Sequence, residues 1–89
     1  MRYTLSPDAA CAAVDDGAVV LHMRTKRYFS LNETGATIWR MLEDDVAVAQ
    51  IAPRLAEQYD IGTAAASEAV TKLLGELAAE ELISLAGDE

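Results

Sequence analysis

The sequence has little of several residue types on which binding sites and active sites commonly depend. Its 89 residues include one cysteine, Cys11, and one histidine, His22. A lone cysteine excludes an internal disulfide. Zinc sites usually have three or four closely spaced Cys, His or carboxylate ligands, so a single Cys and a single His far apart in sequence do not indicate one. The five glycines are scattered along the chain, so they cannot build a phosphate-binding loop. We therefore expect neither a metal nor a cofactor.

The sequence also lacks a recognisable catalytic nucleophile. Nucleophilic catalysis requires a nucleophile with a base beside it. His22 is the only imidazole base, its neighbours have the pattern of ordinary strand residues, and neither a nucleophile elbow nor a reactive-cysteine motif occurs. We predict that the protein is not an enzyme, that Cys11 is inert, and that His22 is a surface strand residue.

Positive charge and long apolar runs are scarce as well. Seven Lys and Arg against fifteen Asp and Glu give a net charge of -8, which disfavours nucleic acids and anionic membranes as partners. No apolar run approaches the roughly 18 residues needed to span a bilayer. The first residues, MRYTLSPD, lack the apolar stretch of a secretory signal peptide. We therefore expect a cytoplasmic protein.

The composition, 52% hydrophobic and 25% charged, is that of one small globular domain covering residues 1–89. Its first part predicts three short antiparallel strands over residues 9–14, 18–23 and 27–31, with turns between them. In the second strand, Val20 and His22 share one face. In the third, Phe29 and Leu31 lie opposite Tyr28 and Ser30. One face of this sheet should be buried.

From Asn32 onward the apolar pattern becomes helical. Asn32 is the expected N-cap of a helix that ends near Glu43. A second helix follows over residues 48–59, in which Pro53 predicts either a kink or a late start of the regular helix. The third helix covers residues 63–80, and residues 82–85 are expected to form a short extended tail.

The third helix carries two parallel stripes of side chains. The apolar stripe, which should face the core, consists of Ala66, Val70, Leu73, Leu74 and Leu77. Beside it, at about 100° of rotation per residue, small residues line one flank: Ser67, Thr71, Gly75 and Ala78. Small side chains leave room for a ligand against this flank.

One segment carries a specific family signal. Residues 27–36 read RYFSLNETGA and are followed by Ile38, Trp39 and Leu42. This stretch resembles the signature of PqqD-like proteins, the RiPP recognition elements that bind leader peptides of ribosomally made natural products. The resemblance covers about residues 5–85. It implies an α+β fold, winged helix-turn-helix-like, with an N-terminal three-stranded antiparallel sheet followed by three helices.

The resemblance also implies a function without catalysis. Relatives bind the precursor leader peptide as an added strand in the groove between the third strand and the third helix, and deliver it to a maturation enzyme. Carried onto this sequence, the strand consists of Arg27, Tyr28, Phe29, Ser30 and Leu31. For the helix wall we add the small flank of the third helix, with Ser67, Thr71 and Ala78 bordering Val70 and Leu74. These ten residues are the predicted peptide-binding site.

Several alternatives stay open. The motif is more similar to the stand-alone proteins of lasso peptide biosynthesis, whose partner is a leader peptidase, than to PqqD of pyrroloquinoline quinone or other radical-SAM pathways. A winged-helix DNA-binding regulator is disfavoured because the exposed face of the third helix is mainly acidic, carrying Glu68, Lys72, Glu76 and Glu80. Arg24, Lys26 and Arg27 form a local basic spot that suits acidic leader residues, and open edge strands also permit a homodimer.

Overall fold

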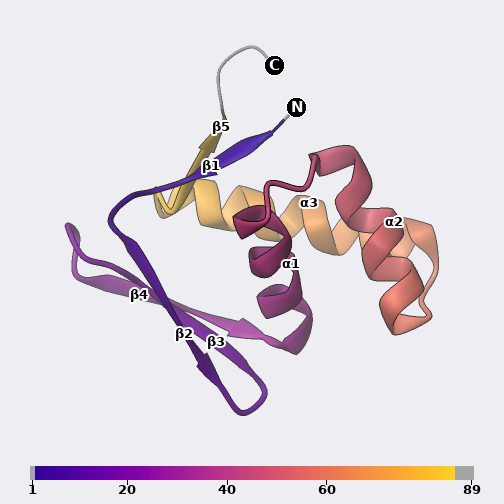
Figure 1. Cartoon of the computed structure of the whole chain (residues 1–89), viewed down its shortest axis with the longest axis horizontal. Coiled ribbons are helices and arrows are strands. Elements are labelled where there is room, and N and C mark those ends of the chain that lie inside the picture. Colours follow the sequence, from indigo (N-terminus) through magenta and orange to yellow (C-terminus); the bar gives the residue numbers. More distant parts are fainter. Residues whose placement is uncertain (1, 86–89) are drawn as a thin grey trace.

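A computed structural model describes residues 2–85 of the chain as an α+β fold (Figure 1). Strands β2 (Ala9–Val14), β3 (Gly17–His22) and β4 (Arg27–Asn32) form an antiparallel sheet in the order β2-β3-β4. Three helices follow: α1 (Glu33–Glu43), α2 (Val48–Tyr59) and α3 (Thr63–Ala79). The α+β class and the order of these six elements are confirmed.

The predicted architecture was incomplete at both ends of the chain. Strands β1 (Tyr3–Leu5) and β5 (Ile83–Leu85) pair with each other and form a second, two-stranded sheet. The fold is therefore not simply an N-terminal three-stranded sheet followed by three helices. Three-residue strands are too short to show an alternating pattern, and their pairing joins residues about eighty positions apart. The expected extended tail is thus a strand that pairs with β1 and leaves β4 at the edge of its sheet.

Helix α1 covers one face of the three-stranded sheet. Helix α1 packs against β3 and β4, and α2 packs against α3. Register places Ala18, Val20 and Leu31 on the covered face. The largest fully buried aliphatic side chains complete the core from the other elements: Ile38, Ile51, Leu55, Leu77 and Leu82.

The surface position predicted for His22 is wrong, because the side chain is only 1% exposed. His22 lies two residues after Val20 and therefore on the same, covered face of β3. Its Nδ1 accepts hydrogen bonds from the backbone N–H groups of Arg24 (3.3 Å) and Thr25 (3.5 Å). The imidazole thus fixes the turn between β3 and β4. Alternation identified the two faces of the strand, but only the tertiary structure decides which of them is buried.

Helix α1 begins at the predicted residue. Helix α2 excludes one of the two alternatives predicted from Pro53, the late start of the regular helix. The Asn32 side chain accepts a hydrogen bond from the Gly35 N–H at 2.7 Å and caps α1. Helix α2 starts at Val48 and continues through Pro53, so its regular part does not start late. Pro53 is exposed and is the sixth of the twelve residues of α2, so its ring removes one backbone hydrogen bond inside the helix.

Two glycines of the fold should respond oppositely to alanine. A methyl group at Gly17 would collide with the backbone carbonyl of Leu31 in the neighbouring strand, whereas one at Gly75 in α3 would meet no atom within 4 Å. We expect Gly17→Ala to lower the free energy of unfolding by about 1–3 kcal/mol through overpacking. Gly75→Ala should raise it by about 0.5–1 kcal/mol through helix propensity. Denaturant titrations of both variants measure these changes, and equal shifts would contradict the close approach of β3 and β4.

Candidate functional site

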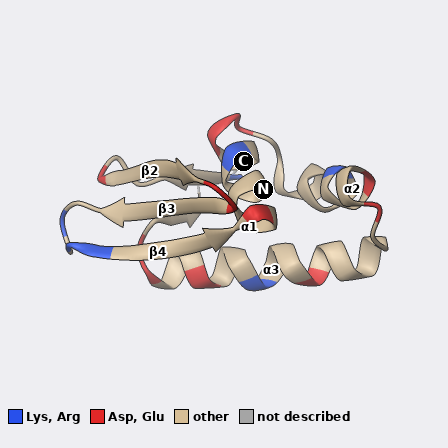
Figure 2. Cartoon of the chain, turned by 90° about the horizontal axis from the view of Figure 1, so that it is seen from below, with Lys and Arg blue, Asp and Glu red and all other residues tan. Residues whose placement is uncertain are grey.

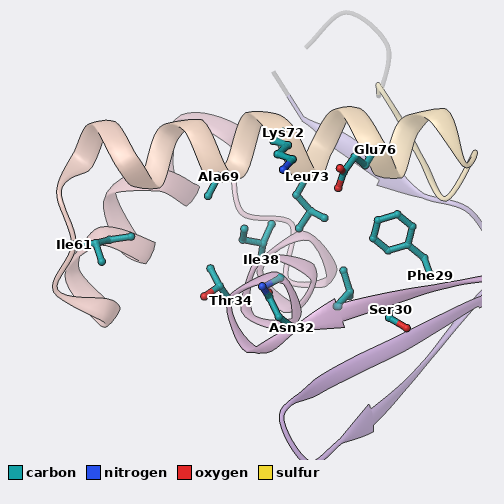
Figure 3. Close-up of a pocket in the computed structure, with 12 residues that line it drawn as sticks. Phe29, Ser30, Asn32, Thr34, Ile38, Ile61, Ala69, Lys72, Leu73 and Glu76 are labelled. Carbon is teal, nitrogen blue, oxygen red and sulfur yellow. The ribbon is translucent and has the colours of Figure 1, made fainter.

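A groove of about 440 Å³ lies between the edge strand β4 and helix α3 (Figure 3). One side is formed by β4 and the start of α1, and the other by α3. The residues that line it are Phe29, Ser30, Leu31, Asn32, Thr34, Gly35, Ile38, Ile61, Ala69, Lys72, Leu73 and Glu76. Apolar side chains from four parts of the chain therefore converge on one open trough, with polar side chains along it.

Each part of the groove follows from a local feature of the fold. Alternation along β4 turns Phe29 and Leu31 toward the covered face of the sheet. Ile38 of α1 is buried and lies between the strand and the helix. Leu73 projects from α3 toward this region, whereas Ile61 lies farther along the trough, just before α3 begins. An extended apolar ligand would thus find contacts along the whole trough.

The backbone of β4 contributes unpaired polar groups to the same groove. The Leu31 carbonyl faces β3, as its closeness to Gly17 shows. In an antiparallel strand the N–H and C=O of one residue point to the same side, and successive residues alternate. The N–H and C=O groups of Tyr28 and Ser30 therefore face away from β3, toward the open edge. No strand among residues 2–85 pairs with this edge, so it can accept a strand from another chain.

The predicted site residues of the strand lie at or beside the groove. Phe29, Ser30 and Leu31 line it. Arg27 lies two residues before Phe29 and therefore on the same face of β4. Tyr28 is on the outer face of the sheet and is 72% exposed.

The predicted residues of the helix wall lie elsewhere on α3. Val70 and Leu74 are buried in the core, and Ser67, Thr71 and Ala78 are exposed on the flank away from the groove. The groove wall is instead formed by Ala69, Lys72, Leu73 and Glu76. At about 100° per residue, this set lies to one side of the core stripe and the small residues lie to the other. Side-chain size along the sequence does not reveal which flank of a helix faces β4.

The basic spot expected at the β3–β4 turn is largely neutralised by the end of α3. Arg24 pairs with Glu81 at 2.7 Å and with Asp8 at 3.7 Å, and Arg27 pairs with Glu80 at 3.2 Å. Figure 2 shows the blue start of β4 above the red C-terminal end of α3. Of the three basic residues, only Lys26 makes no ion pair within the described part of the chain. Folding brings together charges more than fifty residues apart in sequence.

The Arg24–Glu81 pair gives a measurable titration. Arg24 lowers the pKa of the Glu81 carboxyl below its ordinary value, first by its side-chain hydrogen bond and second by its charge. A carboxyl group with a lowered folded-state pKa adds stability above its unfolded pKa and loses that contribution as the pH falls through the folded value. We expect NMR titration to show a lowered Glu81 pKa that returns to the ordinary value in Arg24→Gln. An unchanged Glu81 pKa in that variant would contradict the assignment.

The two residues with potential reactivity lie outside the groove. Burial raises the pKa of the Cys11 thiol, and the nearby Glu43 carboxylate raises it further against the opposing effect of Arg40. A raised pKa favours the unreactive thiol form. The buried Nε2 of His22 has no hydrogen-bond partner among residues 2–85. Residues 2–85 contain no group of three or more His, Cys, Asp or Glu side chains that is placed to bind a metal ion.

Comparison with known proteins adds two kinds of similarity. Residues 17–83 match the family model described as coenzyme PQQ synthesis protein D (PqqD). A structure of TbiB1 in complex with the TbiA(beta) leader peptide is 28% identical, covers 99% of this chain and 100% of that chain, and has a TM-score of 0.85. A lasso peptide synthetase B1 complexed with the leader peptide is 29% identical, covers 97% and 100%, and has a TM-score of 0.81. No curated protein matches the chain. Within residues 2–85, no helix is long and apolar enough to cross a membrane.

Proposed function

Because the chain belongs to the PqqD family, we propose that it is a RiPP recognition element that binds the leader peptide of a precursor. The observation that carries this proposal is the apolar groove beside the unpaired edge of β4. The leader adds to β4 as an antiparallel strand and occupies the space between β4 and α3. We assign this function to a single domain over residues 1–89.

The two walls of the groove supply different parts of the interaction. The outward-facing N–H and C=O groups of β4 pair with the backbone of any extended chain, which gives affinity, whereas pockets for alternate side chains give specificity. Phe29, Leu31 and Leu73 offer apolar contacts to the side chains that point inward. Each buried aliphatic or aromatic group of the leader contributes about 1.5–3 kcal/mol before the cost of ordering a flexible peptide.

Lasso peptide biosynthesis is the pathway that we favour. Both of the similar structures hold a leader peptide, and the second is named a lasso peptide synthetase B1. The family model is that of coenzyme PQQ synthesis protein D, so leader binding in pyrroloquinoline quinone or another radical-SAM pathway is the second candidate. In either pathway we propose a non-catalytic, cytoplasmic adaptor with a winged helix-turn-helix-like arrangement of its helices.

Titration with a synthetic leader tests the proposal directly. The peptide is taken from the precursor gene beside the gene for this chain, and binding is followed by calorimetry or fluorescence anisotropy. We expect saturable binding with one site per chain, and no binding of duplex DNA at moderate salt. Tight DNA binding without leader binding would overturn the proposal, and a neighbouring gene for a cyclase or a radical-SAM enzyme would distinguish the two pathways.

The outer face of the three-stranded sheet suits a maturation enzyme. Antiparallel sheets usually present polar side chains to water, but here the outer face is mostly apolar. Its apolar residues are Ala10, Ala12, Val14, Val19, Leu21 and Tyr28, and Ser30 and Asn32 of β4 are its polar ones. Val14, Leu21 and Tyr28 are exposed by 53%, 38% and 72%. A leader strand added to β4 would continue this surface. We therefore propose that the leader peptidase, or the corresponding enzyme of another pathway, docks here.

Polar substitutions on this face separate docking from leader binding. Val14→Ser combined with Leu21→Ser, on β2 and β3 and away from the leader-binding edge, is expected to slow leader removal by the enzyme about tenfold or more, because each lost apolar contact weakens an interface core. Leader affinity should stay within about twofold, since neither side chain lines the groove. Measured leader affinity and cleavage rate check the two parts separately. Sedimentation of the wild type shows whether a homodimer covers this face instead. An unchanged cleavage rate in the double variant would contradict docking of the enzyme on this face.

A further inference from the structure

One ion pair joins the two walls of the groove at its end. Arg27 Nη2 on β4 donates a hydrogen bond to the Glu80 carboxylate at the end of α3, over 3.2 Å. The groove lining stops at Phe29 on the strand and at Glu76 on the helix. Arg27 lies two residues beyond Phe29, and Glu80 lies one helical turn beyond Glu76. The pair therefore closes the groove immediately past its last lining residues.

The position of Glu80 is unfavourable for the helix itself. Glu80 is the C-cap of α3, and the last turn of this helix has no basic residue. A carboxylate near a helix C-terminus is repelled by the partial negative charge of the exposed carbonyl groups. The arginine that compensates for Glu80 comes from β4, across the groove, rather than from the helix. Helix stability alone therefore gives no reason for an acidic residue here.

A bound leader must pass this point. An antiparallel guest strand starts near Ile61 and Thr34 and runs toward Arg27, because β4 runs in the opposite sense and α3 ends beside the start of β4. A guest that pairs with Tyr28, the first residue of β4 whose backbone groups face the open edge, sets its next residue opposite Arg27, in the space between Arg27 and Glu80. Their hydrogen bond is then broken, and the guanidinium of Arg27 is left without its carboxylate.

We infer that Glu80 is an intramolecular competitor for Arg27, and that the leader displaces it with an acidic side chain of its own. This inference rests on the proposed function and adds a specificity rule to it. The C-terminal part of the bound leader segment carries an Asp or Glu that meets Arg27. Glu80 then lowers the affinity of peptides that lack this carboxylate, because they open the groove without replacing the lost ion pair.

Titrations of the acidic leader and of its Asp→Asn or Glu→Gln version test the inference. Glu80→Gln is expected to tighten binding of the acidic leader about two- to fivefold, which is the range for an exposed ion pair. In an Arg27→Gln background, Glu80→Gln should give no gain, since the competition needs the guanidinium. The amide version of the leader should bind the wild type more weakly than the acidic version, and in the Arg27→Gln variant the two versions should bind equally.

Glu81→Gln is the matched control. It removes the same charge one residue away, from the pair with Arg24, which lies in the turn before β4 and not on the strand that the leader joins. We expect no change in affinity with this variant. Equal gains from Glu80→Gln and Glu81→Gln would indicate general repulsion of an acidic peptide and overturn the inference, as would no gain from Glu80→Gln. A wild type that binds no leader at all would instead refute the proposed function.

Discussion

Replacing Ser30 with proline is expected to weaken leader binding about 10- to 100-fold while the fold is retained. The N–H of Ser30 faces the open edge of β4, as the orientation of the Leu31 carbonyl toward β3 implies. Proline removes this donor and places its ring where the guest strand must approach. The leader carbonyl that would accept the bond is then left unpaired in the groove, at a cost of about 1–3 kcal/mol. Calorimetric titration with the synthetic leader measures the loss.

Ser30→Ala is the control for this prediction, because it removes the hydroxyl and keeps the N–H. Its leader affinity should stay within about twofold of the wild type. Proline is tolerated on an edge strand when its position faces away from the neighbouring strand, so circular dichroism and the unfolding midpoint of Ser30→Pro should remain close to those of the wild type. Normal leader affinity in a folded Ser30→Pro variant would exclude strand addition at β4.

The second large effect is expected on the helix side of the groove. Ala69 is half-buried in the wall that α3 presents to β4. Ala69→Trp would fill the trough with an indole and exclude one inward-pointing leader side chain. A buried aliphatic or aromatic group contributes about 1.5–3 kcal/mol, so leader affinity should fall about 10- to 150-fold. The same titration measures it, with circular dichroism to confirm that α3 remains helical.

Thr71→Trp provides the matched control on the opposite flank of the same helix. Thr71 is exposed and does not line the groove, so the added indole should leave leader affinity unchanged. The flank of small residues on α3 had predicted the opposite, that Thr71 lies in the groove wall and that a bulky residue there blocks leader binding. If Thr71→Trp blocks binding and Ala69→Trp does not, the leader occupies the other flank and the groove assignment is wrong.

The strand side of the groove was predictable because it depends on local order. Alternation in the segment from Arg27 to Leu31 places Phe29 and Leu31 on one face, and a strand followed directly by a helix capped at Asn32 stands out in the sequence. The helix side of the groove was not predictable in the same way. The apolar stripe of α3 fixes which residues enter the core, but two flanks border every stripe. Only the position of β4 relative to α3 selects Ala69 and Leu73 over Ser67 and Thr71.

By itself the sequence determined the α+β class, the six central elements and the family, because these depend on periodicity, caps and one continuous motif. The tertiary structure alone decided the burial of His22, the pairing of β1 with β5 and the ion pairs of Arg24 and Arg27 with Glu81 and Glu80. Each of these joins side chains or strands distant in sequence, or chooses between two faces of one element. Local patterns carry no information on such choices, since they are made only when the elements pack together.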